Sequence, residues 1–388
     1  MVIKPMIRNN VCMNAHPVGC ARYVQEQIDY VKSQGTFWGP KNVLVIGASN
    51  GYGLATRISA AFGARAATIG LAFEKPASRK RTASAGYYNL QAFDEAAERE
   101  GLAHETINAD AFSHETKKDV VERIRERFGT VDLVVYSLAS GVRTDPDTGE
   151  QYRSVLKPIG KPYHSRSVDA FKGTIGEAEL EAATREEIDA TVKVMGGDDW
   201  KLWMEALRDG GVLADGAKSI AYSYMGPELT RPIYRDGTIG QAKEHLESTA
   251  GEIHRMLEGV SGEAYVSINK GIVTRASAVI PVVPLYMSIL FRVMKEKGLH
   301  EGAIEQMYRL FTERLYTDGT VPTDDEGRVR IDDWELRDDV QNEVNALFPQ
   351  VTEETLEQIT DIEQYRRDFL HLHGFGYDDI DYEQDVEP

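Results

Sequence analysis

A tyrosine and a lysine, Tyr234 and Lys243, are the side chains in this sequence that are best suited to chemistry. A phenol O–H can stabilise negative charge that builds on a carbonyl oxygen, and it can deliver a proton. An ammonium group can hydrogen-bond a ribose hydroxyl and lower the pKa of a nearby phenol. We therefore predict that this pair is catalytic, provided that the fold brings the two side chains together.

The spacing of the pair restricts the structures in which it can work. Lys243 follows Tyr234 by nine positions, and at about 100° per residue one continuous helix would place them on opposite faces. The sequence offers a helix start between them, because Gly237 interrupts the chain and Thr238 with Gln241 forms a capping-box pattern. We expect Tyr234 in a loop and Lys243 in the first two turns of the next helix.

A glycine-rich turn near the start of the chain is suited to binding phosphate. It lies between an apolar run that predicts a strand, Asn42–Ile46, and an amphipathic segment that predicts a helix, 52–62. In this setting glycines let the backbone approach a pyrophosphate, and the helix N-terminus offers free N–H groups. The Gly-x-x-x-Gly-x-Gly spacing resembles that of the short-chain dehydrogenase/reductase superfamily and predicts dinucleotide binding. The expected contacts are Gly47, Ala48, Ser49, Asn50, Gly51 and Tyr52.

The end of the second predicted strand indicates which dinucleotide is bound. This strand ends at Phe73 and Glu74, which we predict to be cofactor contacts. A carboxylate here can accept hydrogen bonds from the ribose hydroxyls and would repel a 2′-phosphate, so we expect NADH rather than NADPH. The basic run Arg79-Lys80-Arg81 just beyond fits a solvated loop and a site for a phosphorylated substrate equally well.

Two more predicted strands end in residues suited to cofactor binding. The ligand site of a parallel sheet lies at the carboxyl ends of its strands. In the same superfamily an Asp after the third strand commonly meets the adenine ring, and a small residue after the fourth lets the backbone approach the cofactor. The corresponding residues here are Asp110, Ala111, Leu138 and Ala139.

The elements that must position these residues indicate the fold. Short apolar strands alternate with amphipathic helices over residues 40–280, which is typical of a Rossmann-like, doubly wound parallel α/β sheet. We expect this range to be the dinucleotide-binding and catalytic core. Residues 1–39 predict an N-terminal strand pair and a helix, 151–157 a hairpin arm, and 285–388 a mostly helical C-terminal extension. We expect residues 1–388 to form a single elaborated domain.

Composition and charge exclude several classes of protein. The net charge of −18 disfavours binding to nucleic acid or to a membrane surface, because both are polyanions. Two cysteines, Cys12 and Cys20, suit a reducing compartment and give no disulfide framework, and no metal-ligand spacing is present. The N-terminus lacks the apolar core of a secretory signal. We therefore expect a cytoplasmic protein without a metal site.

The whole chain resembles the trans-2-enoyl-CoA reductase family, which includes the FabV-type enoyl-[acyl-carrier-protein] reductases. The resemblance is carried by the Gly47 to Gly53 turn, the Tyr234 and Lys243 pair with eight residues between, the run Lys270-Gly271-Ile272-Val273-Thr274-Arg275-Ala276-Ser277, and the segments Lys4-Pro5-Met6, Asn14-Ala15-His16-Pro17 and Val142-Arg143-Thr144-Asp145-Pro146.

The resemblance implies a function and two further contacts. It implies NADH-dependent reduction of the carbon–carbon double bond of trans-2-enoyl thioesters in fatty acid synthesis, by a monomeric or weakly associated protein. It implies that Tyr224 contacts the substrate thioester. It also implies that Ile272, Val273 and Thr274 lie along the nicotinamide amide, and a glycine at 271 suits a loop that passes close to the cofactor.

Two other functions are weighed against this one. A short-chain ketoreductase or alcohol dehydrogenase is disfavoured because ordinary members separate the tyrosine and lysine by three residues. A non-catalytic NAD-sensing protein is disfavoured because a sensor needs neither Tyr234 nor Lys243. The sequence leaves open whether coenzyme A or acyl carrier protein carries the substrate, which acyl chain length is preferred, and what the oligomeric state is.

Overall fold

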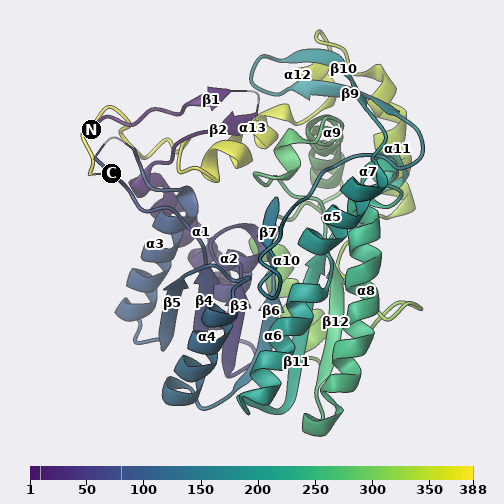
Figure 1. The fold of residues 1–388 in the computed structure, drawn as a ribbon. Helices are drawn as coiled ribbons and strands as arrows, with labels where there is room; N and C mark the ends of the chain where they lie inside the picture. Colours follow the sequence, from purple (N-terminus) through teal and green to yellow (C-terminus); the bar gives the residue numbers. More distant parts are fainter. Residues whose placement is uncertain (9, 80, 388) are drawn as a thin grey trace.

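Seven parallel strands form the central sheet of the protein (Figure 1). The computed structural model describes residues 1–8, 10–79 and 81–387. The strand order is β13-β12-β11-β6-β3-β4-β5. In chain order the strands are β3 (Asn42–Ile46), β4 (Ala67–Ala72), β5 (His104–Asn108), β6 (Val131–Tyr136), β11 (Leu213–Ser223), β12 (Glu263–Ile268) and β13 (Val329–Arg330).

The direction of winding reverses beside β3. Strands β4 and β5 extend the sheet on one side of β3, and β6, β11 and β12 extend it on the other. Such a reversal leaves a crevice outside the carboxyl ends of the two central strands, where dinucleotides bind. The predicted doubly wound, Rossmann-like α/β fold is confirmed.

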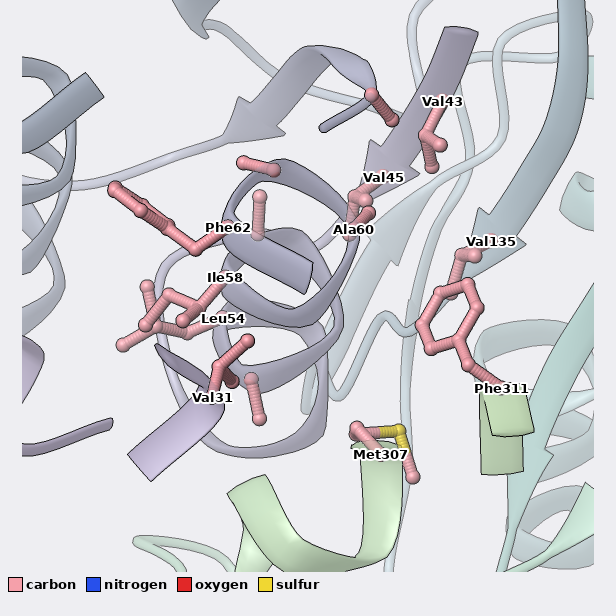
Figure 2. Packing of buried hydrophobic residues seen from close by; sticks show 14 of the residues in the cluster. Val31, Val43, Val45, Leu54, Ile58, Ala60, Phe62, Val135, Met307 and Phe311 are labelled. Atoms are coloured by element: carbon pink, nitrogen blue, oxygen red, sulfur yellow. The ribbon is translucent and has the colours of Figure 1, made fainter. Parts of the chain in front are cut away.

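Side chains of β3 alternate between two hydrophobic cores on opposite faces of the sheet. Val43 and Val45 pack with Leu54 of helix α2 in one core (Figure 2), and Leu44 and Ile46 belong to the other. Because successive strand residues point to opposite faces, an unbroken apolar run is buried on both. The first face is covered by α1 (Pro17–Gln34), α2 (Gly51–Ile58), α3 (Ala85–Arg99) and α10 (Ala303–Leu310), and the second by α4 (His114–Arg127), α6 (Asp198–Asp209) and α8 (Thr238–Met256).

The N-terminal segment contains the expected strand pair and helix. Strands β1 (Ile7–Arg8) and β2 (Val11–Cys12) pair antiparallel, and α1 follows them. The two chain ends lie side by side (Figure 1), where the Met1 ammonium donates to the carbonyl oxygen of Val386 at 2.6 Å. The N-terminal segment is thereby held next to the end of the C-terminal extension.

The segment between β6 and α6 holds two antiparallel hairpins and a helix. Strand β7 (Val142–Thr144) pairs with β8 (Gln151–Arg153), so the predicted hairpin arm is present but shorter than expected. A second hairpin of β9 (Tyr163–Asp169) and β10 (Thr174–Leu180), followed by α5 (Arg185–Met195), was not predicted. Its strands are rich in charged and small polar residues, and β9 is held by contacts with α9 (Val283–Glu296). Pairing of this kind leaves no apolar alternation in the sequence.

The C-terminal extension is mostly helical, as expected. After α9 and α10 it comprises a π-helical turn (Phe311–Leu315), α11 (Asp338–Leu347), α12 (Leu356–Ile359) and α13 (Ile362–His371). The extension also supplies the edge strand β13, which lies beyond the predicted core of residues 40–280. A strand of two residues is too short to show a period, so no sequence pattern predicts it.

The described residues lack a membrane-spanning helix and a cluster of metal-ligating side chains. No helix in the described ranges has the length and apolar character needed to cross a membrane. The same ranges contain no group of three or more His, Cys, Asp and Glu side chains placed to hold a metal ion.

Candidate active site

The turn after β3 can be made only with glycine at two positions. Gly47 has φ 92°, and a Cβ atom there would lie 2.4 Å from the carbonyl oxygen of Ser137. A Cβ atom on Gly53 would lie 1.9 Å from the carbonyl oxygen of Gly47. The two glycines let β3, β6 and the first turn of α2 approach one another at the carboxyl edge of the sheet.

The N-terminus of α2 is free to bind an anion. Asn50 is the N-cap residue, and its side chain makes no capping hydrogen bond to the helix. The first-turn N–H groups of Gly51 and Tyr52 therefore have no side-chain acceptor, and the helix dipole adds partial positive charge at this end. This end of α2, together with the glycine turn, fits the pyrophosphate of a dinucleotide.

The side chains of Ser49 and Asn50 are instead directed to Glu74. The Glu74 carboxylate accepts from Ser49 Oγ at 2.7 Å and from Asn50 Nδ2 at 3.3 Å. Asn89 Nδ2 donates to the carbonyl oxygen of Ser49 at 3.0 Å and so ties this corner to α3. Phe73, the neighbour of Glu74, is 77% exposed. The structure thus joins the glycine turn and the acidic end of β4 in one hydrogen-bonded corner.

The predicted contacts after β5 and β6 lie at the same edge of the sheet. The Asp110 carboxylate accepts from the backbone N–H of Phe112 at 3.0 Å. The Ala111 carbonyl accepts from Lys117 Nζ at 2.9 Å and from the Trp203 indole at 3.0 Å, so this carbonyl is held by the protein. Leu138 is half-buried and Ala139 is exposed.

Tyr234 and Lys243 lie on either side of a helix start. Tyr234 is the last residue of the one-turn helix α7 (Arg231–Tyr234), so the expected loop is wrong at this residue. The expected break is present, because α8 begins at Thr238 and contains Lys243 in its second turn. The predicted capping box is wrong. Gly237 is the N-cap, and Thr238 Oγ1 donates to the carbonyl oxygen of Val155.

Burial shifts the pKa values of both members of the pair. It lowers the pKa of the Lys243 ammonium to about 8, although the carboxylate of Glu247 acts against this. Lys243 Nζ donates to the carbonyl oxygen of Tyr222 at 3.5 Å. Burial, and to a smaller extent the charge of Glu335, raises the pKa of the Tyr234 phenol. The expected lowering of this pKa by Lys243 is therefore wrong, because both influences on the phenol raise its pKa, and the phenol stays protonated at neutral pH.

Tyr224 stands beside Tyr234 at the end of β11. The two rings are 4.6 Å apart between centroids and nearly perpendicular. The Tyr224 hydroxyl donates to Glu335 Oε1 at 2.9 Å. This contact was not predicted, because the carboxylate comes from a segment more than a hundred residues later in the sequence.

The loop after β12 completes the site. The backbone N–H of Gly271 donates to Glu335 Oε2 at 2.6 Å. Ile272 and Val273 line a cavity of about 350 Å³ together with Gly51 of the glycine turn. Thr274 is held by Ser277, whose hydroxyl accepts from the Thr274 backbone N–H at 2.8 Å. The predicted nicotinamide loop and the glycine turn thus both line this cavity.

The hydroxyl of Tyr52 is used within the protein. It donates to the carbonyl oxygen of Lys270 at 2.6 Å and contacts Gln306 Oε1 at 3.1 Å. Tyr52 therefore fixes the base of the 271–274 loop through its side chain. Its backbone N–H remains the group that can face a phosphate.

Three family models match successive parts of the chain. The "NAD(P)H binding domain of trans-2-enoyl-CoA reductase" matches residues 2–79, and the "trans-2-enoyl-CoA reductase catalytic region" matches residues 81–316. The third, described as "enoyl reductase FAD binding domain", matches residues 323–386. The first range contains the glycine turn and Glu74, and the second contains Tyr234 and Lys243.

The described part of residues 323–386 does not fit a flavin dinucleotide. It contains one two-residue strand, β13, three short α-helices and a 3-10 helix (Phe348–Gln350), with no glycine turn between a strand and a helix. Carboxylates occupy the first turns of α11, as Asp338 and Asp339, and of α13, as Glu363. Such charges would repel a pyrophosphate at these helix ends. The apolar side chains of this segment pack against α9 in a third hydrophobic core.

The chain is similar over its whole length to proteins that are named as NADH-dependent reductases. The NADH-dependent trans-2-enoyl-CoA reductase of Treponema denticola is 56% identical, with 100% of this chain and 99% of the relative covered. The NADH-dependent enoyl-[acyl-carrier-protein] reductase of Flavobacterium johnsoniae is 53% identical, with 100% and 98% covered. The crystal structure of the Treponema denticola reductase in complex with NAD superposes with a TM-score of 0.96 and covers 100% of this chain and 98% of that one. This chain therefore belongs to the trans-2-enoyl-CoA reductase family.

Proposed function

We propose that this protein uses NADH to reduce the carbon–carbon double bond of trans-2-enoyl thioesters, as a step of fatty acid synthesis. The observation that carries the proposal is the placement of a buried, protonated Tyr234 beside Tyr224 at the carboxyl edge of a dinucleotide-binding sheet. The names of the Treponema and Flavobacterium relatives support it, because both are NADH-dependent enoyl thioester reductases.

NADH supplies a hydride, which attacks the carbon beta to the thioester carbonyl. Negative charge then builds on the carbonyl oxygen, and we propose that the Tyr234 phenol donates a hydrogen bond to it. The raised pKa of Tyr234 keeps this proton in place until it is needed. One hydride and one proton together give the saturated thioester and NAD⁺. Lys243 is proposed to bind the nicotinamide ribose from α8.

The other predicted contacts are proposed to hold the dinucleotide along the carboxyl edge. The backbone of residues 47–52 would bind the pyrophosphate, and Glu74 with Phe73 would face the adenosine ribose. Asp110 and Ala111 would lie at the adenine, and Leu138 and Ala139 beside the cofactor. Residues 272–274 would bind the nicotinamide amide. Tyr224 would contact the substrate thioester.

The acyl carrier, the oligomeric state, the domain organisation and the cellular compartment are also proposals. The substrate is an acyl thioester of coenzyme A or of acyl carrier protein, and relatives of both names match the whole length of the chain. Arg79 and Arg81 are exposed beyond β4 and could face a carrier phosphate, whereas Lys80 of this basic run lies outside the described residues. We further propose a monomer that forms a single elaborated domain over residues 1–388. Both cysteines are free, which suits a cytoplasmic protein.

One experiment tests the proposed reaction. Purified protein is mixed with NADH and crotonyl-CoA, and the loss of nicotinamide absorbance is followed. Oxidation of NADH with formation of butyryl-CoA supports the proposal. Turnover of ketones but not of enoyl thioesters would show a ketoreductase instead, and NADH binding without turnover of either would show a sensor. Parallel kinetics with crotonyl-acyl carrier protein identify the preferred carrier.

A further inference from the structure

A fully buried carboxylate from the C-terminal extension joins two parts of the candidate site. Glu335 lies in the turn between β13 and α11 and is 0% exposed. Neither the glycine turn nor the Tyr234 and Lys243 pair needs it for the chemistry proposed above. A buried charge is costly unless it is hydrogen-bonded, so its retention here requires a physical explanation.

Both oxygens of Glu335 accept hydrogen bonds from residues at or beside the site. Oε1 accepts from the hydroxyls of Tyr224 at 2.9 Å and Tyr286 at 2.7 Å. Oε2 accepts from the backbone N–H of Gly271 at 2.6 Å. These donors come from the end of β11, from α9 and from the loop after β12. One carboxylate therefore holds together three elements that are distant in sequence.

A buried lysine compensates the charge of this carboxylate. Lys270 is 1% exposed, and its Nζ donates to the carbonyl oxygen of Gly271 at 2.9 Å. Burial raises the pKa of the Glu335 carboxyl, and the nearby Lys270 ammonium and the Gly271 N–H counter this effect. The three donors around Glu335 match an acceptor-only, ionised carboxylate.

We propose that Glu335 is a positioning residue for the reduction, which acts on the substrate through Tyr224 and on the nicotinamide loop through Gly271. This inference rests on the proposed function. Tyr224 donates its single hydroxyl proton to Glu335, so its oxygen can only accept a hydrogen bond on the side of the reacting groups. Tyr234, 4.6 Å away between ring centroids, is then the phenol left to donate to the thioester carbonyl.

The fit between Tyr224 and the loop after β12 leaves little room for adjustment. A Cβ atom on Gly271 would lie 3.2 Å from the Tyr224 hydroxyl oxygen and 3.3 Å from the Met287 methyl group. The loop backbone therefore passes directly beside the Tyr224 hydroxyl. If Glu335 did not hold them, both the phenol and the loop would be free to move away from the cofactor.

The substitution Glu335→Gln separates the two functions of the carboxylate. The amide oxygen can still accept from the Gly271 N–H, while the amide NH₂ takes the place of Oε1 and donates to the two phenol oxygens. The side-chain shape is kept, but the Tyr224 proton is turned away from residue 335. The substitution Glu335→Ala removes both contacts and leaves the Gly271 N–H without a partner.

The test compares the wild-type protein with these two variants. We expect Glu335→Gln to lower kcat/KM for crotonyl-CoA about tenfold, while the Kd for NADH, measured by fluorescence titration, changes less than about twofold. We expect Glu335→Ala to raise the Kd for NADH as well. In a Tyr224→Phe background, Glu335→Gln should cause no further loss, because the residue through which it acts is already changed.

The matched control is Asp332→Asn, which alters another buried carboxylate of the same segment. Asp332 is paired with Arg330 and makes no contact with Tyr224 or Gly271, so this variant should lose thermal stability and keep its kinetic constants. The inference is overturned if Glu335→Gln matches the wild type in kcat/KM, or if its loss persists undiminished without the Tyr224 hydroxyl. Absence of wild-type turnover of crotonyl-CoA would instead overturn the proposed function, and the inference with it.

Discussion

The rings of Tyr224 and Tyr234 meet edge to face, with centroids 4.6 Å apart and an interplanar angle of 89°. One ring comes from the end of β11 and the other from the end of α7. Their hydroxyls differ in environment, because that of Tyr224 donates to Glu335 whereas no acceptor in the described residues binds that of Tyr234. This difference is the basis for assigning proton donation to Tyr234.

Replacement of Tyr234 by Phe is expected to abolish most of the activity. Loss of a proton donor aimed at the developing oxyanion lowers kcat by about 10²-fold or more, while NADH binding is unchanged. The loss in kcat is measured from the rate of NADH oxidation with crotonyl-CoA. Tyr152→Phe is the control, because the Tyr152 hydroxyl bonds Glu150 on the β8 hairpin and no other side chain among the described residues. Equal rates for the Tyr234 variant and the wild type would show that the phenol takes no part in the reaction.

The activity should fall as the pH rises through about 8. Burial lowers the pKa of Lys243 to about 8, so its ammonium form is complete well below this pH and is lost above it. If the cation is required, kcat/KM falls up to tenfold for each further pH unit. Initial rates between pH 6 and 10 locate this descending limb of the pH–rate profile. In Lys243→Arg the guanidinium stays charged, so the descending limb should disappear. A descending limb that persists in this variant would show that another group titrates.

Replacement of Glu74 by Gln is expected to relax the choice of coenzyme. The amide can still accept from the Ser49 hydroxyl, but the negative charge that repels a 2′-phosphate is removed. We expect kcat/KM for NADPH to rise about tenfold relative to that for NADH. Glu98→Gln on the exposed face of α3 changes the net charge equally and should leave this ratio unaltered. If the ratio of kcat/KM for NADPH to that for NADH is unchanged in both variants, Glu74 does not face the adenosine ribose.

Replacement of Gly47 by Ala should damage both folding and NADH binding. The residue has φ 92°, and its Cβ would lie 2.4 Å from the carbonyl oxygen of Ser137, which follows β6, so we expect a loss of at least about 2 kcal/mol in the free energy of unfolding. Gly251→Ala in the exposed middle of α8 meets nothing closer than 3.8 Å and should stabilise by about 0.5–1 kcal/mol. Denaturant unfolding compares the stability of the two variants, and titration with NADH compares their affinity for the coenzyme.

The sequence alone predicts those features of the fold that depend on residues close together in the chain. The glycine turn, the two apolar faces of β3 and the helix that starts between Tyr234 and Lys243 all depend on neighbouring residues and on backbone geometry. The start of α8 was predicted correctly, although through Thr238 rather than through the N-cap Gly237 that the structure shows. Sterically required glycines and helix breaks survive almost any tertiary context.

The division of the chain into a core at residues 40–280 and two flanking segments stays a prediction, as do the roles of the individual site residues. The sheet itself shows why such limits are hard to set from sequence, because its last strand, β13, comes from residues 329–330. Hydrogen bonding to β12 makes these residues a strand, and that pairing joins segments about sixty residues apart.

The sequence by itself determined a dinucleotide-binding sheet, the glycine turn and the candidate pair of Tyr234 and Lys243, because each depends on residue type and short-range spacing. Only the tertiary structure decided that Glu335 holds Tyr224 and Gly271, and that burial raises rather than lowers the pKa of Tyr234. Burial and long-range hydrogen bonds arise from segments that meet only after folding, so no local pattern encodes them.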